Sequence, residues 1–126
     1  MGSIKLIHTR HLSNGLTICI YDHTKVYFGD YHHVRVNIVC IFDSAAVHWL
    51  KYCPDNIDIR SISYTRTLER MGVPSQDVAT AIETLLKDFD LNSLPYIASP
   101  DFPKKMINKE IICKKSTVRK YLGSGS

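Results

Sequence analysis

Several features that define large functional classes are missing from this sequence of 126 residues. No apolar run approaches the roughly 20 residues that a membrane helix needs. No basic segment followed by an apolar run marks a signal peptide at the N-terminus. The four cysteines form no CxxC pair, which argues against a zinc ribbon and a thioredoxin-like redox motif. From these absences we expect a soluble, cytoplasmic protein that does not contact a membrane.

Catalytic and nucleotide-binding motifs are missing as well. The sequence contains no GxxxxGK[ST], GxGxxG, HExxH or GxSxG motif and no EF-hand loop. Glutamate occurs only three times, twice in segments with helical periodicity, so no pair of catalytic carboxylates can be singled out. We therefore expect no cofactor, and we favour a binding function over an enzymatic one.

The composition that remains is that of one ordinary globular domain. Hydrophobic residues make up 44% and charged residues 22% of the chain. The net charge of +4 is uneven, because residues 104–120 hold seven positive side chains and one negative one. We predict a single α+β domain over residues 1–122. A basic, flexible tail is predicted over residues 114–126, where the sequence ends in a linker-like Gly-Ser-Gly-Ser.

Alternating apolar residues give the clearest structural signal. The alternate positions from 34 to 42 are all apolar, so they share one face of a strand: Val34, Val36, Ile38, Cys40 and Phe42. Asn14-Gly15 is a strong hairpin signal between two further strand-like runs, 4–12 and 16–21. Residues 22–30 are predicted as a connection, and the first part of residues 57–71 as a fourth strand. The sequence predicts an antiparallel meander of three or four strands in the N-terminal half.

Helical spacing dominates the C-terminal half. Apolar residues recur at that spacing in residues 75–89, and Ser75 is a suitable N-cap for this helix. A second helix is predicted from residue 99 or 101 and is expected to fray after residue 114. Residues 43–56 fit either a short helix or a loop that carries Trp49. The fold class expected is α+β, with two C-terminal helices covering one face of the sheet.

A group of histidines and one aspartate suggests a metal site near the connection at residues 22–30. Imidazole and carboxylate groups are ligands that zinc, iron or manganese accept. The candidate ligands are His23, Asp30, His32 and His33. Asp30 and His32 would share one face of an extended strand, while His33 points the other way. A small metal- or histidine-dependent enzyme centred here is one alternative, and solvated polar residues at strand ends are the other.

The basic C-terminal segment suggests an anion or nucleic-acid interface. Its cations could neutralise several phosphates: Lys104, Lys105, Lys109, Lys114, Lys115, Arg119 and Lys120. Tyr121 is the only aromatic residue near its end, so a base-stacking platform is not supported. A solvated terminal helix explains the same charges.

The function that best fits these observations is a small non-enzymatic binding or adaptor domain that acts through protein partners, a homodimer among them. The hydroxyl-rich residues 61–67 fit the solvent face of a sheet, or an exposed strand edge that accepts a partner strand. Cys19 and Cys40 stand inside apolar strands, where reduced cysteine behaves as a small hydrophobe. A disulfide between them requires that their strands be neighbours.

Overall fold

The computed structural model describes residues 4–43 and 46–123, and for residues 46–47 and 115–123 it describes the backbone alone. The strands are β1 (Lys5–His11), β2 (Leu16–Asp22), β3 (Lys25–Phe28), β4 (Tyr31–Phe42) and β5 (Ser63–Pro74). The short 3-10 helices are η1 (Ala46–Tyr52) and η2 (Ile59–Ser61), between β4 and β5, and η3 (Ser75–Asp77), directly after β5. The α-helices are α1 (Val78–Asn92), α2 (Leu94–Ile97) and α3 (Phe102–Gly123).

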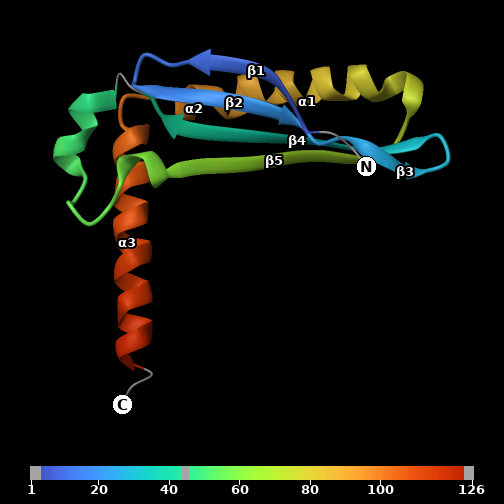
Figure 1. Ribbon diagram of the computed structural model, residues 1–126. Helices are drawn as coiled ribbons and strands as arrows, with labels where there is room; N and C mark the ends of the chain where they lie inside the picture. Colours follow the sequence, from blue (N-terminus) through green and yellow to red (C-terminus); the bar gives the residue numbers. More distant parts are fainter. Residues whose placement is uncertain (1–3, 44–45, 124–126) are drawn as a thin grey trace.

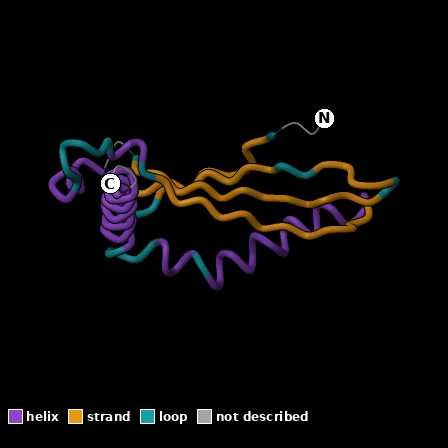
Figure 2. The backbone as a smooth tube through the Cα atoms, turned by 90° about the horizontal axis from the view of Figure 1, so that it is seen from below, coloured by secondary structure: helices purple, strands orange, loops and turns teal. Residues whose placement is uncertain are grey.

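The strands form one antiparallel sheet with β4 at its centre (Figure 1). One side of β4 pairs with β2 and β3, and the other side pairs with β5, while β1 pairs with β2. The α1 and α2 helices run along one face of this sheet (Figure 2). The predicted α+β class and antiparallel sheet are therefore confirmed.

The predicted connection at residues 22–30 is corrected by the structure, because it contains the strand β3. Phe28 pairs with Tyr31, which leaves a two-residue turn of Gly29 and Asp30. Gly29 has φ +57°, as the first turn position of a type II′ hairpin requires. Only four residues long and without apolar alternation, β3 is held by its pairing with β4 rather than by a buried face of its own.

The fourth strand also differs from the prediction, because it begins and ends later. Residues 57–62 hold η2, where the Asp58 side chain caps the N-terminus by accepting from the Arg60 N–H over 2.9 Å. β5 then continues through Gly72 to Pro74, beyond the range predicted for the fourth strand. Gly72 has φ +68° and lies where the register between β4 and β5 shifts, so it serves as a β-bulge rather than a strand end.

The hydrophobic core fills the space between the sheet and the helices. The predicted alternation is confirmed, since the side chains of Val34, Val36, Ile38, Cys40 and Phe42 are all buried. All but Val34 pack with Leu16, Ile18 and Ile20 of β2 and with Leu86 and Phe89 of α1. The first turns of α3 close one end of this core with Phe102, Met106 and Ile107.

Polar contacts fasten α1 to the edges of the sheet. The Arg10 guanidinium on β1 makes a two-pronged ion pair with the Asp90 carboxylate on α1. At the opposite edge Arg66 of β5 donates to the Ser93 hydroxyl just after α1. Both arginines are partly exposed. Polar contacts at exposed positions add little to the free energy of unfolding, so these two mainly fix the position of α1 on the sheet.

The start of α1 corrects one further prediction. Ser75 does not cap this helix, because it belongs to η3 and its hydroxyl donates to the Asp30 carboxylate, 2.6 Å away. The N-cap residue of α1 is Asp77, and its side chain makes no capping hydrogen bond. The tertiary contact with Asp30 thus takes the place of the local cap that the sequence suggested.

Residues 43–56 and the C-terminal helix complete the fold. The segment left open as helix or loop contains η1, whose Trp49 donates from Nε1 to the Asn14 carbonyl oxygen over 2.9 Å. The backbone of α3 is helical to Gly123, where the sequence suggested fraying from residue 114. The first part of α3 contacts the body, and the helix backbone then extends away from the sheet (Figure 1). No helix in the described part of the chain is long and apolar enough to span a membrane.

Candidate functional site

The most unusual surface of the molecule lies at the hairpin between β3 and β4. Tyr27, Phe28 and Tyr31 are 62%, 77% and 50% exposed, and the neighbouring Val26 is 63% exposed. Large apolar side chains with this exposure are ordinary when scattered, but a contiguous group is characteristic of an interaction site. We call Tyr27, Phe28, Tyr31 and Gly72 the aromatic tip.

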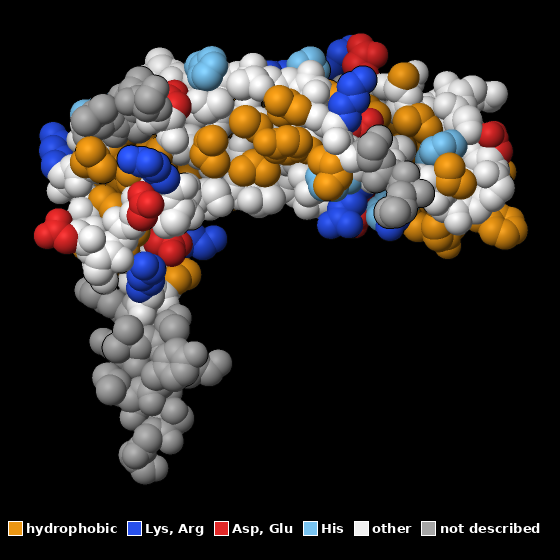
Figure 3. Space-filling model, in the orientation of Figure 1, with side chains coloured by type: hydrophobic (Ala, Val, Ile, Leu, Met, Phe, Trp, Pro, Cys, Tyr) orange, Lys and Arg blue, Asp and Glu red, His pale blue; other side chains and the backbone are white. Residues whose placement is uncertain are grey.

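The aromatic tip surrounds an open hollow of about 600 Å³, lined by its three rings and by Gly72. Hydrophobic side chains protrude at the end of the sheet farthest from α3 (Figure 3). Three aromatic rings at these exposures present roughly 400 Å² of surface, taking about 200 Å² for each whole side chain. That area lies within the range of about 300–600 Å² found for the largest patch on a monomer.

Gly72 shapes the hollow because it carries no side chain. A Cβ atom built at Gly72 would have no neighbour within 4 Å, so the space above this residue is open. A second, smaller hollow of about 290 Å³ also borders Gly72, between the end of β5 and the start of α1. Its lining is mixed: polar side chains from both elements stand beside apolar ones such as Met71 and Ala81. Gly72 therefore lies between an aromatic hollow and a mixed one that contains Arg70 and Asp77.

Contacts with η3 hold the hairpin in place. The Ser75 hydroxyl donates to the Asp30 carboxylate over 2.6 Å, and the Ser75 backbone N–H donates to the Asp30 carbonyl oxygen over 3.1 Å. Beneath the hairpin, Val34, Val73 and Ala81 form a small buried cluster that joins β4, β5 and α1. The aromatic tip is thus displayed by a supported hairpin, which lowers the ordering cost of binding.

The four predicted metal ligands do not converge. His33 lies on the sheet face opposite α1, with Nε2 2.9 Å from Glu69 Oε2. His23 contacts the Asn37 amide, 3.2 Å from its Nε2. Asp30 and His32 are brought together at the hairpin end, where both contact the Ser75 hydroxyl. Among the residues that the structure describes, no group of three potential ligands could hold a metal ion. The arrangement therefore adds no support for a metal site, which stays a prediction from sequence.

The contacts of Asp30, His32 and Ser75 do not make a nucleophilic triad. In such a triad the histidine takes the proton of the serine, and the carboxylate orients the histidine. Here the Ser75 hydroxyl donates to the Asp30 carboxylate, and His32 Nδ1 lies 3.4 Å from the same hydroxyl. The arrangement orders the hairpin and does not activate the serine.

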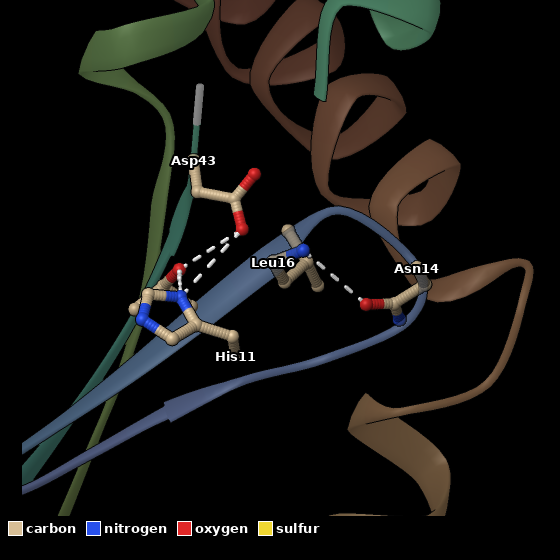
Figure 4. A network of polar contacts seen from close by, with 5 residues as sticks. His11, Asn14, Leu16 and Asp43 are labelled. Carbon is tan, nitrogen blue, oxygen red and sulfur yellow. Dashed lines mark hydrogen bonds and ion pairs between the residues drawn. The ribbon is translucent and has the colours of Figure 1, made fainter. Parts of the chain in front are cut away.

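A second polar network joins β1, β2 and the end of β4 (Figure 4). His11 Nδ1 lies 3.0 Å from the Thr17 hydroxyl, which donates to Asp43 Oδ2 over 3.1 Å. Because the single hydroxyl proton of Thr17 goes to Asp43, the hydroxyl accepts from His11, which fixes a proton on Nδ1. Thr17 is buried, so a substrate cannot reach its hydroxyl from solvent. The network is structural.

The structure describes the side chains of only a part of the predicted basic interface. Lys104, Lys105, Lys109 and Lys114 are exposed on α3, whereas the side chains of Lys115, Arg119 and Lys120 lie outside the described residues. Lys104 Nζ lies 5.3 Å from the ring centroid of Tyr52, and Lys105 Nζ lies 4.8 Å from that of Tyr96. Lys114 donates to the Asn56 carbonyl oxygen over 3.2 Å.

Two of these contacts place lysines over aromatic rings of the same chain, and the third places Lys114 against a backbone carbonyl oxygen. They do not gather the described lysines around a common hollow. A nucleic-acid interface on α3 stays a prediction from sequence.

The cysteines show no redox site among the described residues. Cys19 pairs in register with Val39, and Cys40 pairs with Ile18, so the two thiols point to opposite faces of the sheet. The neighbouring strands therefore do not allow the disulfide that was considered. Burial raises the pKa of Cys40 to about 12, with a smaller contribution from Cys19. Burial and Asp58 likewise raise the pKa of Cys53.

The sequence did not predict the aromatic tip, because Tyr27 and Phe28 lie in residues 22–30, which the pattern assigns to a connection. The available signal was the run Val26-Tyr27-Phe28 directly before Gly29-Asp30, with Tyr31 directly after it. Three apolar residues beside a turn pair predict either a buried loop or an exposed hairpin end, and only the three-dimensional arrangement separates these. Comparisons of the chain with protein families, with curated proteins and with solved structures found no match.

Proposed function

We propose that this protein is a small non-enzymatic binding domain that acts through a protein partner, and that the aromatic tip is its contact site. The observation that carries the proposal is the exposure of Tyr27, Phe28 and Tyr31 around one hollow. Exposed tyrosine supplies a large, stiff contact area, and such residues dominate the binding energy of many protein interfaces.

The charges around the tip favour a protein over a nucleic acid or a membrane surface. Lys25 and Asp30 are exposed beside the aromatic rings, and Arg70 and Asp77 are exposed in the adjoining hollow. Cations and anions are therefore balanced. A phosphate-rich partner favours an excess of cations, whereas a protein surface offers both signs at the rim of an apolar contact.

The test is selection of ligands from a random peptide library displayed on phage, with the full chain as the immobilised target. We expect the selected peptides to carry aromatic or large aliphatic residues. Synthetic copies should bind the chain with a Kd that rises more than tenfold in Phe28→Ser and in Tyr31→Ser, because truncation of an aromatic side chain at the centre of an interface costs about 2 kcal/mol or more. Amide chemical-shift changes should centre on residues 26–31 and 70–73.

The matched control is Leu91→Ser, which removes a 76%-exposed apolar side chain from α1. This change should leave the peptide Kd unaltered. Peptides whose binding is indifferent to both tip variants would contradict the assignment of the site. Tip-dependent binding to anionic vesicles or to RNA, with no peptide selected, would instead replace the protein partner by another class.

A further inference from the structure

The face of the sheet opposite α1 carries no helix in the described chain (Figures 1 and 2). Its side chains follow from the strand register, because residues on alternate positions point away from the core. On β2 these are Thr17, Cys19 and Tyr21, and on β4 they include Asn37, Val39 and Ile41. We call this surface the open face.

The open face has an apolar centre and a polar border. Figure 3 views this face and shows hydrophobic side chains along its middle. The apolar members are Leu6, Cys19, Tyr21, Val39 and Ile41, and all of them are partly or largely accessible to solvent. The border strands carry hydroxyl groups instead, at Thr9 of β1 and at Ser63, Thr65 and Thr67 of β5. An apolar centre with a polar rim is the usual composition of a protein interface.

The charges on the open face nearly cancel. Arg35 of β4 and Glu69 of β5 are register partners, and Lys25 of β3, the register partner of His33, lies on the same face at the β3 end. His33, beside them, already contacts the Glu69 carboxylate. Two copies of this surface brought together would therefore add only a small net charge, so like-charge repulsion opposes self-association weakly.

The area of the open face is close to the area that each chain buries in a stable two-chain interface. Four strands about 4.8 Å apart, running side by side for about seven residues at 3.3 Å each, cover roughly 450 Å² of flat sheet. The stretch where β3, β4 and β5 continue alone adds roughly 200 Å². The sum approaches the roughly 800 Å² that each partner contributes to a stable interface. A short peptide would cover only a part of this area.

We propose that the open face binds the open face of a second copy of this chain, and that the protein forms a homodimer of two stacked sheets. Each sheet supplies an identical flat surface, and two-fold pairing of one surface with itself is the commonest way in which identical chains associate. Stacked sheets lie about 10 Å apart with their strands inclined by about 30°. Cys19, Val39 and Ile41 then lie inside the interface, with helices on the two outer sides.

Thiol labelling of the unmodified chain tests the proposal without any substitution. Cys19 lies on the open face, whereas Cys113 is exposed on α3 and serves as the internal reference. The chain is labelled briefly with a maleimide at concentrations from low micromolar to near millimolar, and each site is quantified by mass spectrometry. Labelling of Cys19 should slow about tenfold or more as the dimer forms, while labelling of Cys113 stays constant.

Light scattering after size-exclusion chromatography supplies the second measurement. The unmodified chain should elute with twice the mass of one chain, and Val39→Glu should elute as a monomer with an unchanged far-ultraviolet circular dichroism spectrum. Leu91→Glu places the same charge on the outer helix and should remain dimeric. Should Val39→Glu fail to fold, the concentration dependence of Cys19 labelling still decides.

Two results would overturn the proposal. One is a chain that stays monomeric at near-millimolar concentration. The other is a dimer in which Cys19 labels as fast as in the monomer, which would place the contact on a strand edge or on the aromatic tip. Val39→Glu separates this proposal from the preceding one, since it should abolish the dimer and leave the Kd of peptides bound at the aromatic tip unaltered.

Discussion

Asn14 connects the hairpin between β1 and β2 to the helical half of the chain, and its replacement should destabilise the fold strongly. The side chain is 7% exposed. Its Nδ2 donates to the carbonyl oxygens of Ile97 and Ser99 over 2.9 and 2.8 Å. Its Oδ1 accepts from the Leu16 N–H over 3.3 Å (Figure 4). One amide therefore satisfies three backbone groups on both sides of the core.

The expected magnitude follows from these contacts. Each hydrogen bond contributes a net of about 1 kcal/mol, and a buried carbonyl left without a donor costs about 1–3 kcal/mol. Asn14→Ala should thus lower the free energy of unfolding by about 3 kcal/mol. Asn14→Asp should cost about 4 kcal/mol near neutral pH, because a carboxylate donates nothing and faces the oxygens of Ile97 and Ser99.

The pH dependence of Asn14→Asp supplies a sharper test. Burial beside carbonyl oxygens raises the pKa of the introduced carboxyl group above its unfolded value of about 4. A group with a raised folded pKa costs least below the unfolded pKa, where it is neutral and can donate one hydrogen bond. The cost relative to the unmodified chain should grow as pH rises from about 4 through the raised pKa.

Urea denaturation followed by circular dichroism measures both variants across this pH range. Asn108→Asp, at an exposed position of α3, is the matched control and should change stability by less than about 0.5 kcal/mol. If Asn14→Ala proved as mild as this control, the three hydrogen bonds would not connect the two halves of the core as argued. A pH-independent cost of Asn14→Asp would refute the burial of the carboxyl group.

Two further predictions concern the core. Ile38→Ala, at a fully buried position of β4, should lower the free energy of unfolding by about 3 kcal/mol, whereas Ile112→Ala on exposed α3 should cost under about 0.5 kcal/mol in the same urea titration. The Cys40 thiol, with its pKa raised to about 12, should resist iodoacetamide at pH 8 in the folded chain and react after unfolding, while exposed Cys113 reacts in both states. Because the folded pKa of Cys40 is raised, its contribution to stability is complete below pH 9.0 and is lost as pH rises toward 12. Rapid alkylation of Cys40 in the folded chain would contradict its burial.

The parts of the fold that the sequence predicts are those with a repeating local signal. Alternation from Val34 to Phe42 is visible in the letters because a buried strand face imposes it every second residue. The helical repeat that ends at Phe89 is visible for the same reason. The strand β3 was missed because four exposed residues carry no alternation, and their pairing depends on β4.

The roles of single polar residues were harder to predict, because they depend on partners far along the chain. Asn14 was correctly assigned to a turn, yet its amide binds carbonyl oxygens more than 80 residues away. Ser75 has the sequence features of a helix cap, and a partner 45 residues earlier takes its hydroxyl instead. Local propensity is a weak prior wherever a tertiary contact satisfies the same group.

Hairpin stability is a second explanation for the aromatic residues at the tip. Phe28 and Tyr31 are register partners, and an aromatic pair across two strands contributes about 0.2–1 kcal/mol. That contribution accounts for one pair of residues beside a tight turn. It does not account for Val26, which pairs with His32, or for Tyr27, which lies where the register shifts, and both are more than 60% exposed. The hairpin would close without them, so the surplus of exposed apolar surface is better explained by contact with another molecule.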